Sequence, residues 1–125
     1  MAKRILDVGQ CGVDGPRISQ LLTHLGYHVD RAHSKDEALK LAAERAYDLV
    51  LVNRILDRDR SPGLAVIAAL RAAHPPLCVM LISDREDAQA QAEMLGAIPG
   101  FGKYNLESDE TEAAIRAALE TKEHA

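Results

Sequence analysis

Residues 47–53, with the sequence Tyr-Asp-Leu-Val-Leu-Val-Asn, decide the fold class of this chain. A continuous apolar run that ends in one polar residue is typical of a buried strand in a parallel sheet. In open α/β proteins, ligands bind at the carboxyl ends of such strands. Asn53 therefore marks the place where we expect the functional crevice.

On both sides of this strand, short apolar runs alternate with helical patterns. Alternation of this kind predicts an α/β fold of the flavodoxin-like type: a doubly wound, five-stranded parallel sheet with helices on both faces. The expected strand order is 2-1-3-4-5, which places the crevice between strands one and three. The predicted strands are residues 5–8, 27–32, 47–53, 77–82 and 98–102.

Polar residues and glycines mark the ends of the predicted helices. Gly26 and Gly96 stand where two helices should end. Ser34 and Glu37 have the spacing of a capping box, in which each side chain accepts a backbone N–H of the first helical turn. Helix starts are also expected at Ser61-Pro62, at Ser83 and Asp84, and at Ser108; for the helix after Ser108 we expect a buried stripe of Ala113, Ile115, Ala118 and Leu119.

The chain of 125 residues has no linker or break in composition, so we expect one domain over residues 1–120 and a frayed tail over 121–125. The net charge of −4 argues against direct binding of nucleic acid or of an anionic membrane. No apolar run has the length of a membrane span. Cys11 and Cys78 cannot form a CxxC or zinc motif, and reduced thiols favour a cytoplasmic location.

The predicted crevice is framed by Gly9–Gly15, Asn53–Arg60, Ser83–Asp84 and Lys103. In this order the segments resemble the signature positions of response-regulator receiver domains of two-component signalling. The resemblance covers about residues 3–120. It is carried by Arg4-Ile-Leu-Asp-Val8, Gly26-Tyr-His-Val29, Asp48-Leu-Val-Leu-Val-Asn53, Val79-Met-Leu-Ile-Ser83, and Gly96-Ala97 followed by Lys103.

The chain departs from this family at the positions that carry its chemistry. Gly9 and Gln10 stand where the family has acids that hold Mg²⁺, and Asn53 stands where it has the phosphoacceptor aspartate. Gly100 replaces a frequent aromatic switch residue. Tyr104 replaces the proline after the lysine, so we expect a trans Lys103–Tyr104 peptide bond. Ser83 and Lys103 are retained.

The resemblance with these departures implies a degenerate receiver that does not accept phosphate at Asn53. We expect a phosphorylation-independent protein-interaction module, with no enzymatic activity, catalytic residue, metal site or cofactor. The implied partners are a second copy, a histidine kinase or an output domain. They would bind the face of the fourth helix, fifth strand and fifth helix, which we expect at residues 84–95, 98–102 and 108–119.

Two alternatives stay open at this point. Gly9, Gly12 and Gly15 follow a strand and precede a helix, so this loop together with Ser83 and Lys103 can serve a small-molecule or anion sensor. Equally, Ser83 or Asp84 can be a simple helix cap and Lys103 can pair with a nearby acid. In the other alternative the chain is an ordinary receiver with an engineered Asn53.

Asp7 is unusual because it is a carboxylate inside a strand that should be buried. Burial of a charged carboxylate is costly. We therefore expect either a raised pKa for Asp7 or a side chain that faces the crevice.

Overall fold

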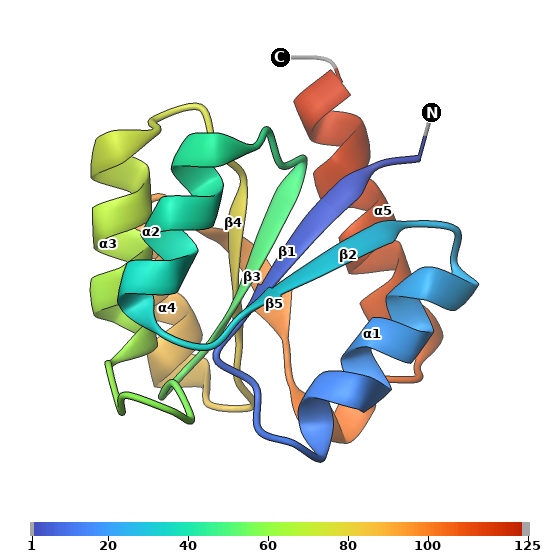
Figure 1. Ribbon diagram of the computed structural model, residues 1–125. Helices are drawn as coiled ribbons and strands as arrows, with labels where there is room; N and C mark the ends of the chain where they lie inside the picture. Colours follow the sequence, from blue (N-terminus) through green and yellow to red (C-terminus); the bar gives the residue numbers. More distant parts are fainter. Residues whose placement is uncertain (1, 124–125) are drawn as a thin grey trace.

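The computed structural model describes residues 2–123, and it has a central parallel sheet between two layers of helices (Figure 1). The strand order is β2-β1-β3-β4-β5, and each neighbouring pair of strands is parallel. The predicted fold class and strand order are confirmed. The strands are β1 (Arg4–Val8), β2 (His28–Ala32), β3 (Leu49–Asn53), β4 (Val79–Ile82) and β5 (Ile98–Phe101).

Helices α1 and α5 cover one face of the sheet, and α2, α3 and α4 cover the other (Figure 1). In the part of the chain that the structure describes, no helix is long and apolar enough to cross a membrane. The helices are α1 (Asp14–His24), α2 (Lys35–Glu44), α3 (Gly63–Ala73), α4 (Glu86–Met94) and α5 (Asp109–Glu123), with a short 3₁₀ turn, η1 (Lys103–Asn105), before α5.

The apolar run in β3 is continuous because both sides of this strand are buried. Val50 and Val52 pack with the α2–α3–α4 layer, whereas Leu49 and Leu51 pack with the α1–α5 layer. All four side chains are fully buried. A strand at the centre of a parallel sheet needs apolar side chains on both faces, which explains the pattern that identified it.

The structure corrects the predicted start of α3. Ser61 is not a cap: the helix begins at Gly63, and Pro62 is the residue before it. The Ser61 carbonyl accepts a hydrogen bond from the Leu56 N–H at 2.9 Å, and Pro62 pairs with Ile55 in an antiparallel bridge. The chain after β3 therefore folds back on itself before the helix can start.

The predicted start of α4 is also wrong, because α4 begins only at Glu86. The Ser83 hydroxyl accepts the Arg85 N–H at 3.2 Å, and the Asp84 carboxylate accepts the Lys103 N–H at 3.2 Å. Both side chains thus bind backbone groups of the surrounding loops, and neither caps the helix.

Other helix boundaries agree with expectation. Gly26 and Gly96 have left-handed backbones and follow α1 and α4. The Ser34 hydroxyl accepts the Glu37 N–H at 3.1 Å. The Glu37 carboxylate accepts the His33 N–H at 2.8 Å. In the standard capping box it would accept the N–H of the next residue, Ser34.

Helix α5 begins as expected, since the Ser108 hydroxyl accepts the Thr111 N–H at 3.2 Å. Its buried stripe includes Ile115, Ala118 and Leu119. Ala113 was expected in this stripe but is exposed, and Thr111 is buried instead. The helix reaches Glu123, so residues 121–123 of the expected tail are helical, while residues 124–125 lie outside the described residues.

Candidate functional site

The carboxyl ends of the strands meet at the lower edge of the molecule in Figure 1, where the loops after β3, β4 and β5 enclose a hollow of about 390 Å³. We call this hollow the crevice. Three of the predicted site residues line it together: Asn53, Ser83 and Lys103. Gly9 and Gln10 are not among its lining residues.

Asn53 uses its carboxamide to join two segments of backbone. Its Nδ2 donates to the carbonyl oxygens of Gly9 at 3.0 Å and Ile55 at 2.9 Å, and its Oδ1 accepts the Arg54 N–H at 3.0 Å. The first bond ties the end of β1 to the end of β3. An ionised carboxylate has no N–H and could make neither of the two donated bonds.

Leu56 occupies the space beside Gly9. Its side chain is fully buried, although it comes from the polar loop after β3. A side chain on Gly9 would collide with Leu56, and Gly9 has a left-handed backbone with φ of +81°. The Asp57 N–H also donates to the Gly9 carbonyl at 3.0 Å. Any acid at position 9 would have to displace this leucine.

Lys103 is paired with Asp14 at the start of α1. Its Nζ lies 2.9 Å from Asp14 Oδ2, and the Cys11 thiol donates to the same oxygen at 3.4 Å. The hydrogen bond from Lys103 is the main cause that holds the pKa of Asp14 below its ordinary value. This geometry agrees with the interpretation that Lys103 pairs with a nearby acid. The Lys103–Tyr104 peptide bond is trans, as expected.

Asp7 and Gln10 form a buried polar pair below the loop after β1. Their exposed fractions are 1% and 4%, and neither side chain completes a hydrogen bond with a group in the described part of the chain. Burial raises the pKa of Asp7 to about 7. Gln10, Arg31 and Lys103 each lower this pKa, but their effect is smaller than that of burial. Of the two alternatives for Asp7, the raised pKa is the one that the structure supports.

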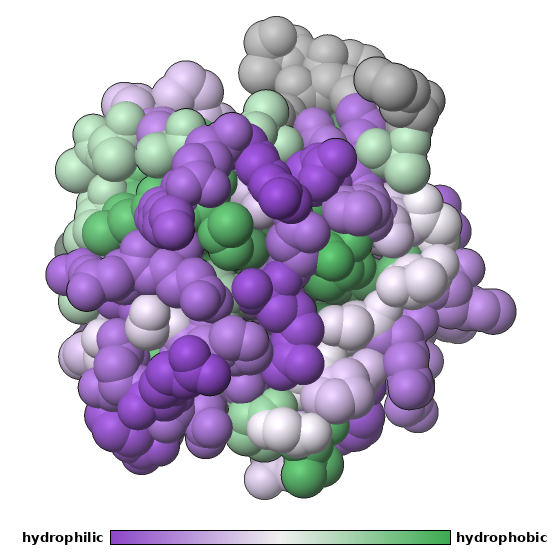
Figure 2. All heavy atoms as spheres, viewed as in Figure 1, coloured by the Kyte–Doolittle hydropathy of each residue, from purple (hydrophilic) through white to green (hydrophobic). Residues whose placement is uncertain are grey.

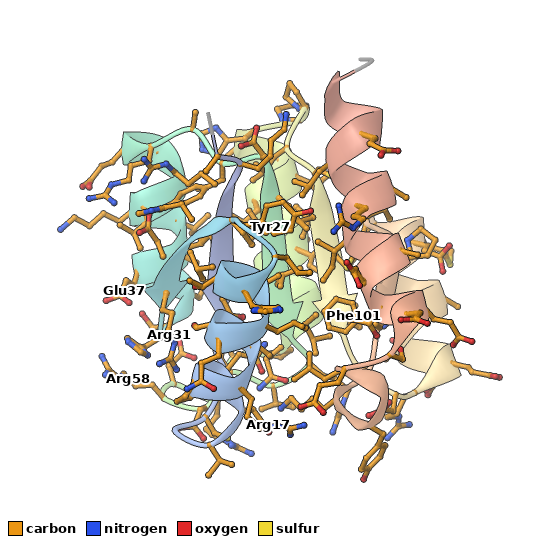
Figure 3. All side chains as sticks on the ribbon, turned by 90° about the vertical axis from the view of Figure 1, so that its right-hand side faces the viewer. Arg17, Tyr27, Arg31, Glu37, Arg58 and Phe101 are labelled. Carbon is orange, nitrogen blue, oxygen red and sulfur yellow. The ribbon has the colours of Figure 1, made fainter. Side chains whose placement is uncertain are left out.

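A second, smaller hollow of about 210 Å³ lies on the β2 side of the loop after β1. Gln10 lines it together with Arg31, Arg58 and three other residues. Arg31 and Arg58 lie near one another beside α1 (Figure 3). Gln10 and Asn53 therefore belong to different hollows, separated by the loop that carries Leu56.

Gln89 of α4 connects its helix to β4 and β5. Its Nε2 donates to the carbonyl oxygens of Leu81 at 2.9 Å and Ser83 at 3.0 Å, and its Oε1 accepts the Gly100 N–H at 3.1 Å. A side chain at Gly100 would collide with the Leu81 carbonyl and approach the Gln89 amide. The amide of Gln89 thus holds α4 against β4 and β5 beside Gly100.

Comparison with known proteins identifies the family. The family model of the response regulator receiver domain matches residues 16–100. This chain is a receiver domain. It is 29% identical over 116 residues to the transcriptional regulatory protein ZraR of Escherichia coli O157:H7. The aligned region covers 90% of this chain and 24% of ZraR. The chain therefore spans about a quarter of the length of that relative.

Solved structures agree with this family. The receiver domain of NtrX from Brucella abortus is 30% identical and has a TM-score of 0.83. The match covers 94% of this chain and 98% of the NtrX chain. The signal receiver domain of an HD domain-containing protein from Pseudomonas fluorescens Pf-5 is 28% identical, with a TM-score of 0.87. That match covers 98% of this chain and 90% of the other. A CheY-like receiver from Methanospirillum hungatei is 20% identical and shares the fold, with a TM-score of 0.85. The match covers 99% of this chain and 98% of the other.

The residues of this receiver domain do not fit the Mg²⁺ ion that the family's acids bind. Mg²⁺ prefers carboxylate oxygens, and positions 9, 10 and 53 offer none. Asp7 is buried with a pKa of about 7, and Asp14 is paired with Lys103. Within residues 2–123, no group of three or more His, Cys, Asp or Glu side chains could hold a metal ion.

Sequence reasoning missed Leu56, Gln89 and the partner of Lys103. The apolar pair Ile55-Leu56 inside a charged loop was the available signal for the first of them. Gln89 lies among other polar residues of an amphipathic helix, so nothing in its sequence context distinguishes it from its exposed neighbour Gln91.

We expect Asn53→Asp to destabilise the domain at pH 7, by about 1–3 kcal/mol, because a carboxylate would face the two carbonyl oxygens that Asn53 now donates to. Urea unfolding measures the change. Asn53→Ala is the matched control, since it removes the same bonds without adding a charge. Asn53→Asp should be the less stable of the two; equal or greater stability would contradict the assigned role of the amide.

We expect Asp7→Asn to remove a pH dependence of stability. An acid whose folded pKa of about 7 exceeds its unfolded pKa of about 3.9 binds more protons in the folded state between these values. Its contribution to stability is therefore present in acid and is lost as the pH rises from about 4 to about 7. At 1.36 kcal/mol for each pH unit, the loss is limited to about 4 kcal/mol.

Unfolding free energies of Asp7→Asn measured from pH 4 to pH 8 test this. The variant should be more stable than the parent at pH 8 and should lose the downward slope. Glu44→Gln, which changes an exposed carboxylate at the end of α2, should keep the slope. A parent protein without this slope would show that Asp7 does not titrate as described.

We expect Gln89→Ala to cost about 1–3 kcal/mol, because it removes three hydrogen bonds and leaves partly buried backbone groups without their partner. Amide hydrogen exchange at Gly100 should become faster, whereas Gln91→Ala on the exposed side of α4 should leave it unchanged. Unchanged exchange at Gly100 in Gln89→Ala would mean that α4 is held by other contacts.

Proposed function

We propose that this receiver domain, formed by residues 1–120, is a phosphorylation-independent protein-interaction module of two-component signalling. One observation carries the proposal: the Asn53 amide donates to two backbone carbonyl oxygens at the phosphoacceptor position. This position serves as a structural link between β1 and β3. The domain has a signalling role and no catalytic residue of its own.

The surroundings of Asn53 support the same conclusion. Phosphoryl transfer depends on positioned charge, supplied largely by the metal ion and its carboxylate ligands. In this domain Leu56 occupies the space beside position 9, and Gln10 lines a different hollow from Asn53. Restoring the chemistry would require rebuilding the loop after β3 as well as replacing side chains. This argues against an ordinary receiver in which only Asn53 was engineered.

The interaction surface that we propose is the face formed by α4, β5 and α5. The Gln89 bonds hold α4 and β5 in one arrangement, so this face does not need a phosphoryl group to set its shape. The proposed partners are a second copy, a histidine kinase or an output domain. The relative ZraR is a transcriptional regulator of about four times the length of this chain. Cysteine usage supports a reducing, cytoplasmic location, because Cys11 and Cys78 form neither a CxxC nor a zinc motif.

The test is an amide NMR titration with Mg²⁺ and then with Mg²⁺ plus beryllofluoride, together with mass spectrometry after incubation with acetyl phosphate. We expect no Mg²⁺-dependent saturable shifts at Asn53, Ser83 and Lys103, and no gain of a phosphoryl mass. A receiver with an intact aspartate is the positive control. Saturable shifts at these residues that require Mg²⁺, or phosphorylation of the parent or of Asn53→Asp, would contradict the proposal.

A further inference from the structure

The crevice collects positive charge from three separate loops. Arg54 and Arg60 come from the loop after β3, Arg85 from the loop after β4, and Lys103 from the turn after β5. Asp84 is the only acid among the lining residues. A receiver with its acids in place would balance such charges, whereas here positions 9, 10 and 53 are all uncharged.

Two of the four cations are already engaged. Lys103 pairs with Asp14 at 2.9 Å, and the Arg85 guanidinium holds both carboxylate oxygens of Asp87 at 3.1 and 2.9 Å. Arg54 and Arg60 are exposed and form no ion pair with any described residue. In Figure 2 hydrophilic side chains gather at the lower left, where Figure 1 places the loop after β3. Two uncompensated guanidinium groups thus stand on one wall of the crevice.

The loop that carries these arginines is held in place. Leu56 anchors it in the core, the Arg60 N–H donates to the Leu56 carbonyl at 3.1 Å, and Ile55 is bridged to Pro62. Arg60 has a left-handed backbone with φ of 59°, and within the described chain it is the only residue other than glycine with a positive φ. Binding groups on a loop that is already ordered lose little conformational entropy when they engage a ligand.

The size and remaining wall of the crevice limit what can enter. Its volume of about 390 Å³ suits a small molecule. The Ser83 hydroxyl is half-buried on the β4 side, and the Tyr104 ring stands 91% exposed at the rim. Guanidinium groups bind phosphate and carboxylate groups through paired N–H donors.

We propose that the crevice binds a small multivalent anion, bearing phosphate or carboxylate groups, by non-covalent contacts with Arg54 and Arg60. The bound anion would bring negative charge to the place where other receivers carry a covalent phosphoryl group. This inference rests on the proposed function only in that Asn53 is not a phosphoacceptor. The two can fail separately, because phosphorylation is read by mass and anion binding by titration.

The chain offers matched variants for the test. Arg54→Ala removes one proposed contact, and Arg60→Gly removes the other while placing glycine, the residue best suited to it, at the left-handed position. Arg60→Gly should therefore fold at least as stably as the parent. Arg58→Ala is the control, because Arg58 belongs to the same loop but lines the hollow beside Arg31 (Figure 3).

The experiment is an amide NMR titration of the full chain with inorganic pyrophosphate and, separately, with citrate. An ionic strength of about 0.15 M suppresses loose attraction between exposed charges. We expect saturable shifts in residues 54–60 and at Ser83, with the affinity lowered about tenfold or more by Arg54→Ala and by Arg60→Gly. Arg58→Ala should change the affinity less than twofold.

The two ligands distinguish the sources of the anion. Saturation by pyrophosphate alone assigns a phosphate ligand, saturation by citrate alone a carboxylate ligand, and saturation by both supports the shared chemistry. Absence of saturable shifts with either ligand would overturn the proposal. So would an equal loss of affinity in Arg58→Ala, because it would show a general attraction to surface charge with no defined site.

Discussion

The two hydrogen bonds donated by the Asn53 amide are the constraint on which the functional end of this domain depends. They join the last residue of β3 to the backbone of Gly9 after β1 and to Ile55 in the following loop. With these segments held together, Leu56 is carried into the space beside Gly9. The Asn53 amide supplies the N–H donors of these bonds, which an ionised carboxylate lacks.

Two side chains, Leu56 and Gln89, each fill a space between neighbouring elements. Leu56 closes the region below the loop after β1, and Gln89 closes the region between α4 and β5, where Gly100 leaves no room for a side chain. Protein interiors are close-packed, so a group that fills a site prevents the movements that an empty site would allow. Leu56 and Gln89 therefore restrict movement of the loop after β1 and of α4.

Charge in the crevice has a different origin from packing. The four cations of the crevice are spread over residues 54–103 of the sequence and show no cluster there: Arg54, Arg60, Arg85 and Lys103. Parallel strands bring the loops that carry them to one edge of the sheet. Asp14 and Asp87 neutralise part of this charge, and the rest lies on Arg54 and Arg60 in the loop after β3.

The fold and its strand order could be predicted from the sequence. The crevice could be predicted only in part: it was expected between strands one and three, but the loops after β3, β4 and β5 line it. Strands buried on both faces must be apolar throughout, and glycine and serine mark helix ends through local backbone chemistry, so short segments carry this information. The sequence also located Asn53, Ser83 and Lys103 at one edge. The starts of α3 and α4 were mistaken, because Ser61, Ser83 and Asp84 bond to loop backbone instead of helix N–H groups.

The contacts of the side chains at the crevice depend on parts of the chain that are far apart in the sequence. Asn53, Lys103 and Gln89 each contact a residue distant in the sequence. These partners, Gly9, Asp14 and Gly100, lie 44, 89 and 11 positions away, and no local pattern encodes such contacts. The burial of Leu56 and the unpaired state of Arg54 and Arg60 depend on how one loop folds over the end of β1. Local preferences set the elements, whereas packing and the pairing of charges across the sheet edge set their function.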